Sequence, residues 1–192
     1  GAPFYMLVGN LFTQFASDPS QVSRTVNFLN ALLSAGCILF LFWSITRLVR
    51  SLLKEEKENL SVTDVIIILG SGLVGALAYT FSDTFWFSAV EGEVYAFSSF
   101  LTALVFWMIL RWQDESDTVY GDRWIILIAY IIGLSIGVHL LNLLCIPAIV
   151  LVFYYQKYRT ISLKGAIAAI ALSGLLIVLI LFVYIPGMAD IG

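Results

Sequence analysis

Residues 165–185 read GAIAAIALSGLLIVLILFVYI, an apolar run without a charged side chain. A run of this length crosses the roughly 30 Å hydrocarbon core of a bilayer as one α-helix. Five more apolar runs precede it, at 25–49, 64–81, 94–112, 124–138 and 143–155. The chain is 60% hydrophobic and 12% charged, and its mean hydropathy is +0.96. The period-two alternation of a transmembrane barrel is missing. These features predict an all-α, polytopic transmembrane helical bundle of about six spans.

The basic residues gather in three polar islands between the runs, at 50–63, 113–123 and 156–164. Nine of the ten Lys and Arg residues lie in or beside these islands, and Arg24 is the exception. Cytoplasmic loops carry an excess of Lys and Arg, so the islands are predicted to face the cytoplasm. We therefore predict an integral membrane protein, of a bacterial inner membrane, with loops 82–93 and 139–142 on the periplasmic side. No basic stripe is present, which argues against nucleic acid as a partner.

Residues 124–155 are predicted to cross the membrane twice, because Arg123 and Lys157 at their ends both belong to cytoplasmic islands. Each arm then measures roughly 24 Å, which is less than the roughly 30 Å hydrocarbon core. The tip at 137–142 is expected below the outer surface, where irregular backbone needs protein or water beside it. This predicts an outer recess with His139 and Asn142 at its floor. The alternative is one long tilted helix that places Lys157 outside.

Residues 1–20 are apolar up to Phe15 and polar after it. The apolar part is too short to span a bilayer, and it is predicted to form a helix in the outer interface. The chain does not begin with Met and opens abruptly at Gly1. We expect it to be an excerpt of a longer protein, with residues 1–192 forming a single transmembrane domain.

The segment between the second and third apolar runs is acidic and aromatic. Residues 81–93 read FSDTFWFSAVEGE, with the carboxylates Asp83, Glu91 and Glu93 and no Lys or Arg. Glu93 either caps the helix that follows, where an acid gains roughly 0.3–1 kcal/mol from the helix dipole, or serves as a hydrogen-bonding or acid–base group. Glu91 and Glu93 are two residues apart and are expected to face different ways.

Aromatic and polar residues near this segment have two interpretations each. Trp86 and Tyr95 either belong to an interfacial aromatic belt or stack on a sugar ring. His139 is the only histidine and either makes a structural hydrogen bond or contacts substrate. Arg24 either anchors the chain at the interface or binds a phosphate, whose oxygens match the planar guanidinium. The candidate substrate-binding residues are Arg24, Trp86, Glu91, Glu93, Tyr95, His139 and Asn142.

Several motifs are best explained by packing. Gly70 to Gly75 (GSGLVG) match a dinucleotide-binding pattern, but inside a span small residues indicate close helix contact. Gly133 and Gly137 form a second pair of this kind. Cys37 and Cys145 lie in apolar runs and are predicted to be buried free thiols. No metal site and no certain cofactor is predicted, and the need for a divalent metal stays open.

Four stretches carry a resemblance to a known family: GAPFY at 1–5, RTVN at 24–27, FWFSAVEGEVYA at 85–96 and GLSIGVHLLN at 133–142. They resemble the large polytopic family labelled "domain of unknown function 2723". That family includes a eukaryotic transmembrane protein O-mannosyltransferase and is placed in the GT-C superfamily of membrane glycosyltransferases. The similarity spans essentially the whole chain, and the Trp…Glu-Val-Tyr-Ala block is its most specific part.

The resemblance implies a GT-C-type glycosyltransferase that moves a sugar, by O-glycosyl or mannosyl transfer, from a polyprenyl-phosphate donor to a protein or peptide acceptor on the outer face. Family members carry an Asp-x-Gly-Glu pair followed by His-Pro-Pro-Gly, and this chain begins at the corresponding Gly. The catalytic base, the first transmembrane helix and a C-terminal part are therefore expected outside residues 1–192, and the excerpt alone is expected to be inactive.

Two other classes of protein remain as alternatives. A transporter or lipid flippase module with an outward-facing cavity would also be polytopic, but it favours ionisable residues within the spans. Here the ionisable residues gather at span ends, which favours the enzyme. The third alternative is a membrane scaffold whose outer loop binds a partner protein.

Overall fold

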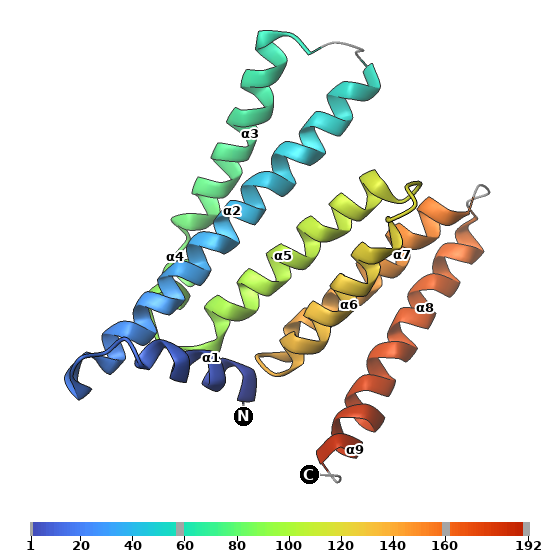
Figure 1. The fold of residues 1–192 in the computed structure, drawn as a ribbon. Coiled ribbons are helices and arrows are strands. Elements are labelled where there is room, and N and C mark those ends of the chain that lie inside the picture. Colours follow the sequence, from blue (N-terminus) through green and yellow to red (C-terminus); the bar gives the residue numbers. More distant parts are fainter. Residues whose placement is uncertain (1, 57–59, 159–161, 190–192) are drawn as a thin grey trace.

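The computed structural model describes residues 2–56, 60–158 and 162–189, and the regular secondary structure of this part of the chain is all helical (Figure 1). The long helices are α2 (Val22–Glu56), α3 (Val62–Thr80), α5 (Val94–Glu115), α6 (Asp122–Ile136), α7 (Cys145–Lys157) and α8 (Leu163–Leu179). Shorter elements are α1 (Pro3–Thr13), the 3-10 turns η1 (Pro19–Gln21) and η2 (Leu140–Leu144), α4 (Asp83–Val90), the π-helical segment η3 (Ile180–Tyr184) and α9 (Ile185–Ala189).

Each predicted apolar run forms a helix, and the helices confirm a polytopic membrane protein. Within the described residues, five helical segments are long and apolar enough to cross a bilayer: Pro19–Leu53, Val62–Thr80, Val94–Glu115, Leu140–Lys157 and Leu163–Gly187. The remaining predicted span, at 124–138, differs, because α6 has only 15 residues. Its length of about 22 Å is less than the roughly 30 Å hydrocarbon core. By contrast, α2 has 35 residues and, at about 52 Å, extends beyond that core.

Residues 124–155 form the predicted hairpin and not one long tilted helix. Helix α6 ends at Ile136, and the N–H groups of Val138 and His139 both donate to the Ser135 carbonyl, at 2.9 and 2.8 Å. The chain then returns through η2 and α7 alongside α5 (Figure 1).

The two ends of the bundle differ as the charge pattern predicts. The C-terminal ends of α2, α5 and α7 and the N-terminal ends of α3, α6 and α8 lie toward one end, in the upper part of Figure 1. Helices α1 and α4, the α6–η2 turn and α9 lie at the other end, where both chain termini are marked. We call these the island end and the α4 end. Helix α1 lies across the α4 end, steeply inclined to the long helices, and its predicted place at a membrane interface stays a prediction.

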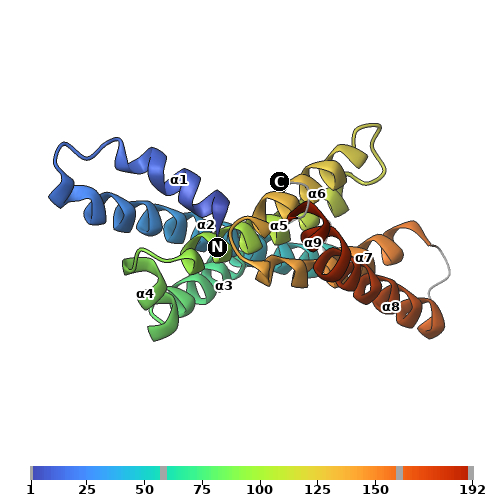
Figure 2. The same cartoon turned by 90° about the horizontal axis from the view of Figure 1, so that it is seen from below.

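The long helices follow one another in the order α3, α2, α5, α6 with α7, and α8, and the view from below shows an open array (Figure 2). Glycines allow the close contact of α3 with α2. A Cβ added at Gly72 would lie 2.4 Å from Thr46 Cγ2, and one at Gly75 would lie 2.5 Å from Ile45 Cδ1. The predicted packing role is thus confirmed for Gly72 and Gly75, whereas Gly70 has open space beside it.

The main apolar core joins α5 to α6 and α7. Its buried residues are Val105, Met108, Ile109, Trp112, Ile128, Ile132 and Leu143. Trp112 stacks on Phe153 of α7 with ring centroids 5.7 Å apart and 11° between the planes. Cys37 is buried and Cys145 partly buried, and both are free thiols as predicted.

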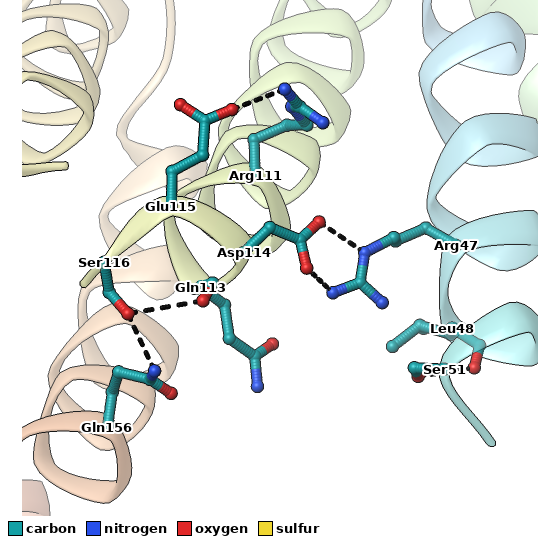
Figure 3. A network of polar contacts seen from close by, with 9 residues as sticks. All are labelled: Arg47, Leu48, Ser51, Arg111, Gln113, Asp114, Glu115, Ser116 and Gln156. Carbon is teal, nitrogen blue, oxygen red and sulfur yellow. Dashed lines mark hydrogen bonds and ion pairs between the residues drawn. The ribbon is translucent and has the colours of Figure 1, made fainter. Parts of the chain in front are cut away.

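Polar contacts at the island end tie α2, α5, α6 and α7 together. Arg47 of α2 holds Asp114 of α5 through both carboxylate oxygens (Figure 3). Glu115 accepts from Arg111 at 2.5 Å and from Trp124 Nε1 of α6 at 2.8 Å. Gln156 of α7 donates to Ser116 Oγ at 2.7 Å (Figure 3). These contacts set the spacing of the helices at this end.

Candidate functional site

The acidic, aromatic segment between α3 and α5 contains a short helix. Expected only as a loop over 82–93, it forms α4 from Asp83 to Val90, followed by an extended linker at 91–93. Phe85 is buried and its ring lies 4.5 Å, centroid to centroid, from the ring of Tyr79 in α3. Trp86 and Phe87 are exposed. An eight-residue helix is marginal by itself, so the packing of Phe85 stabilises it.

A buried amide of α2 holds the linker after α4. Asn30 is fully buried, and its Nδ2 donates to the Glu91 carbonyl and, at 2.9 Å, to the Glu93 carbonyl. One turn earlier in α2, Asn27 and Val26 lie beside Gly92, where an added Cβ would be 3.2 Å from both Asn27 Oδ1 and Val26 Cγ1. The backbone of both glutamates is therefore fixed against α2, which leaves their side chains exposed.

Sequence reasoning missed Asn30. The available signal was an amide inside an apolar run, three residues after Asn27 and so on the same helical face. Burying an amide costs free energy unless it is hydrogen-bonded, so its position in a span indicates a partner.

Glu93 is the residue that precedes α5, as predicted, but its side chain makes no capping hydrogen bond. Its carboxylate instead lies near Tyr5 of α1. Burial raises the pKa of the Tyr5 hydroxyl, the nearby Asn30 side chain lowers it, and the negative charge of Glu93 raises it further. Tyr5 Oη and Asn30 Oδ1 are both buried without a hydrogen-bond partner among the described residues. The Tyr5 hydroxyl, the Asn30 amide and the exposed Glu93 carboxylate are thus close enough to influence one another.

The α6–η2 turn packs against α1 and α5. The Phe4 N–H donates to the Gly137 carbonyl at 2.8 Å, and a Cβ on Gly137 would lie 2.8 Å from Phe4 Cβ. Val138 of the turn is buried with Tyr5, Phe97 and Leu101. Gly137 is therefore required for the close contact with α1, whereas Gly133 has open space beside it.

His139 is the N-cap residue of η2 and makes a structural hydrogen bond. Its Nδ1 accepts from the Leu141 N–H at 3.1 Å. With Nδ1 as the acceptor, the neutral ring carries its proton on Nε2. The imidazole lies 5.7 Å from the Tyr95 ring, centroid to centroid. Asn142 is fully buried; its Oδ1 accepts from Cys145 Sγ at 3.3 Å, and its Nδ2 has no partner among the described residues.

Two adjoining pockets lie between α2, α3, α4, α5 and the η2–α7 segment. The first, of about 530 Å³, has polar groups in its wall and is lined by Tyr79, Thr84, Phe85, Phe87, Ser88, Glu91, Tyr95 and Ser99. The second, of about 380 Å³, is mainly apolar and is lined by Cys37, Leu41, Ser44, Tyr79, Ser99, Thr102, Ala103, Phe106, Leu141 and Cys145. Tyr79 and Ser99 belong to both walls, so the polar pocket adjoins the apolar one directly.

The structure brings some of the predicted site residues together. Glu91 and Tyr95 line the polar pocket, and Trp86 lies on the helix that forms one of its walls. His139 touches Tyr95 from the neighbouring turn. Arg24 is exposed near the start of α2, three residues before Asn27, and no contact among the described residues joins it to the others. Within the described ranges, no three His, Cys, Asp or Glu side chains gather as a metal site requires.

One comparison with known proteins identifies a family. A family model described as the protein O-mannosyl-transferase TMEM260 N-terminal domain matches residues 1–162. This range includes α1, the α4 linker, the two pockets and the α6–α7 hairpin, and it leaves α8 and α9 outside. No curated protein and no solved structure matches the chain.

Proposed function

Because this chain belongs to the family of the protein O-mannosyl-transferase TMEM260 N-terminal domain, we propose that it forms the membrane core of a GT-C-type glycosyltransferase. The sugar passes from a polyprenyl-phosphate donor to a hydroxyl group of a protein acceptor. The bond between the anomeric carbon and the phosphate oxygen breaks, and polyprenyl phosphate leaves with the electron pair. The acceptor oxygen bonds to that carbon, and its proton passes to a base.

The observation that carries this proposal is the junction at Tyr79 and Ser99. A polar pocket that contains Glu91 and Tyr95 adjoins an apolar pocket that extends to Leu141 and Cys145. A polyprenyl-phosphate sugar has the same division, with a polar sugar phosphate joined to a hydrocarbon chain. The polar pocket suits the sugar, and the apolar pocket suits the first isoprene units.

The side chains at the α4 end suit the two substrates in different ways. Arg24 is the cation of that end, and its planar guanidinium matches the oxygens of the donor phosphate. Glu91, Trp86 and Tyr95 are assigned to the sugar, through hydrogen bonds to hydroxyl groups and stacking on the ring.

Glu93, His139 and Asn142 are assigned to the acceptor side. The Nε2 proton of His139 is available for donation, because Nδ1 is already occupied by the Leu141 N–H. We assign the α4 end to the outer or lumenal face of the membrane, since the basic islands favour the cytoplasm.

The test uses the purified full-length protein, a polyprenyl-phosphate mannose and an acceptor peptide. Ser99→Phe places a ring at the junction of the two pockets, and we expect donor affinity and transfer to fall at least tenfold. Ile126→Phe is the matched control, because Ile126 is exposed on α6 and lines neither pocket. If both variants bind donor as well as wild type does, the donor does not occupy this junction.

Arg24 is tested separately through donor binding. Arg24→Ala removes a charge-assisted pair worth roughly 1.5–3 kcal/mol, so donor affinity should fall about ten- to a hundredfold. Arg24→Lys should recover only part of the loss, because an ammonium group cannot copy the planar fork. Donor affinity within about twofold of wild type for folded Arg24→Ala would make Arg24 an interfacial anchor.

A further inference from the structure

A separate pocket of about 480 Å³ lies between α2, α3, α5 and α6, at the island end of the bundle. Its wall contains three indoles, Trp43, Trp107 and Trp124, and three guanidinium groups, Arg47, Arg50 and Arg111. Its lining residues in α2 and α5 belong to the C-terminal halves of these helices, and it shares no lining residue with the two pockets of the candidate transferase site.

The indole rings form a continuous aromatic wall. The Trp43 and Trp107 centroids are 5.7 Å apart, and those of Trp107 and Trp124 are 6.1 Å apart. Ile68 and Leu69 of α3 complete the apolar part of the pocket. Tryptophan is enriched at the level of lipid headgroups, where its ring is apolar and its N–H is polar. The pocket therefore has an amphipathic wall at the depth where the apolar runs give way to charged islands.

The guanidinium groups leave this pocket positively charged. Arg47 is paired with Asp114, and Arg111 is paired with Glu115 (Figure 3). Arg50 is exposed and makes no ion pair with any of the described residues. Among the described residues, Arg47 and Arg111 each have a paired carboxylate, and Arg50 has none. Each guanidinium has five N–H donors, so Arg47 and Arg111 also keep donors that their carboxylates do not use.

We propose that this pocket binds the phosphate headgroup of an anionic glycerophospholipid. Arg50 and the free N–H donors of Arg111 hold the phosphodiester, since guanidinium matches phosphate oxygens in a bidentate way. The indoles and Ile68 contact the glycerol and the first acyl carbons. Basic pockets between transmembrane helices suit such headgroups. The apolar wall distinguishes a lipid from free phosphate, which has nothing to place against it. The proposal is independent of the glycosyltransferase assignment.

The test measures lipid binding to the purified full-length protein in detergent micelles. Phosphatidylglycerol brominated near the start of its acyl chains is titrated, and quenching of tryptophan fluorescence reports its approach to the indoles. We expect it to bind at least tenfold more tightly than phosphatidylcholine with the same chains. Arg50→Gln should weaken phosphatidylglycerol binding about tenfold, and Arg50→Gln with Arg111→Gln should abolish the preference.

Arg123→Gln is the matched control. Arg123 is also an exposed arginine of the island end, but it lies over the Tyr120 ring and outside the pocket. This variant should bind phosphatidylglycerol as wild type does. Equal binding of the two lipids, or equal loss in Arg50→Gln and Arg123→Gln, would overturn the proposal. Displacement of the lipid by millimolar inorganic phosphate would also overturn it, because the site would then bind a soluble anion.

Discussion

The side-chain amide of Asn30 donates a 2.9 Å hydrogen bond to the backbone carbonyl of Glu93, across 63 positions of sequence. The same nitrogen also donates to the Glu91 carbonyl. One fully buried amide therefore fixes the linker that carries both glutamates. Through this contact, α2 determines where Glu91 meets the polar pocket and where α5 begins.

Asn30→Asp should lower stability, because it keeps the shape of the side chain but removes both donors. Two carbonyl groups lose their partner and a carboxylate is buried near them, so we expect a loss of about 1–3 kcal/mol or more. Thermal unfolding of the full-length protein in detergent measures the effect. Asn27→Asp is the control, since Asn27 is exposed. An equal change in the two variants would contradict the role of Asn30.

Gly137→Ala should separate α1 from the α6–η2 turn. The new Cβ would lie 2.8 Å from Phe4 Cβ and 3.3 Å from the Leu134 carbonyl oxygen, and overpacking of this kind costs about 1–3 kcal/mol. Faster amide hydrogen exchange in α1 is the expected readout. Gly133→Ala serves as the control because nothing lies within 4 Å of the added Cβ. It should be neutral or slightly stabilising. Unchanged exchange in Gly137→Ala would mean that α1 does not depend on this contact.

His139→Asn distinguishes a structural histidine from one that contacts substrate. Asparagine keeps an acceptor for the Leu141 N–H at the start of η2, so the midpoint of thermal unfolding should stay near that of wild type. If His139 contacts the acceptor as proposed, transfer should nevertheless fall at least tenfold. His139→Ala should lower both quantities. Full transfer activity in His139→Asn would leave only the structural role.

The pH dependence of Tyr5 follows from its buried hydroxyl. Burial raises its pKa above the ordinary value of about 10. The folded state therefore favours the neutral phenol, and this contribution to stability is fully present below about pH 10. It is lost as the pH rises through the folded pKa. The tyrosinate absorbance of the wild type and of Tyr5→Phe is measured against pH. The difference between the two curves should show a group that ionises above pH 10. Ionisation at or below pH 10 would contradict this prediction.

The sidedness of the chain is tested by single-cysteine labelling, with Cys37 and Cys145 replaced. Asp83 in α4 and Val119 in the α5–α6 connection are both exposed and lie at opposite ends of the bundle. If the basic islands face the cytoplasm, a membrane-impermeant reagent added outside should label Asp83→Cys and spare Val119→Cys until the membrane is permeabilised. Labelling in the reverse order would invert the topology and move the candidate site to the inner face.

Several residues of the candidate site could be predicted from residue type alone. How they come together in space could not. The sequence singles out Glu91, Tyr95 and His139 as polar or aromatic residues at the ends of apolar runs. It does not reveal that Tyr95 meets His139 or that Ser99 joins two pockets, because these contacts bridge α5 to η2 and to α3. Asn30 was missed for the same reason: its partners are 61 and 63 residues away. Helix α4 was missed because its stability depends on Phe85 packing against Tyr79 of α3.

The sequence by itself determined where the helices form and which ends of them carry positive charge. Hydrophobic run length and charge position are properties along the chain, and the cost of exposing backbone groups to hydrocarbon leaves a long apolar run only the helix. The shortness of the first hairpin arm, α6, was determined in the same way. Only the tertiary structure decided which helix faces meet: Gly72 with Thr46, Asn30 with Glu91 and Glu93, and the tryptophans with the arginines of the island end. Lipid can cover any apolar helix face, so burial of apolar surface does not select which helices pair. The pairing of helices depends on close packing and on hydrogen-bonded buried polar groups, which are properties of two helices together.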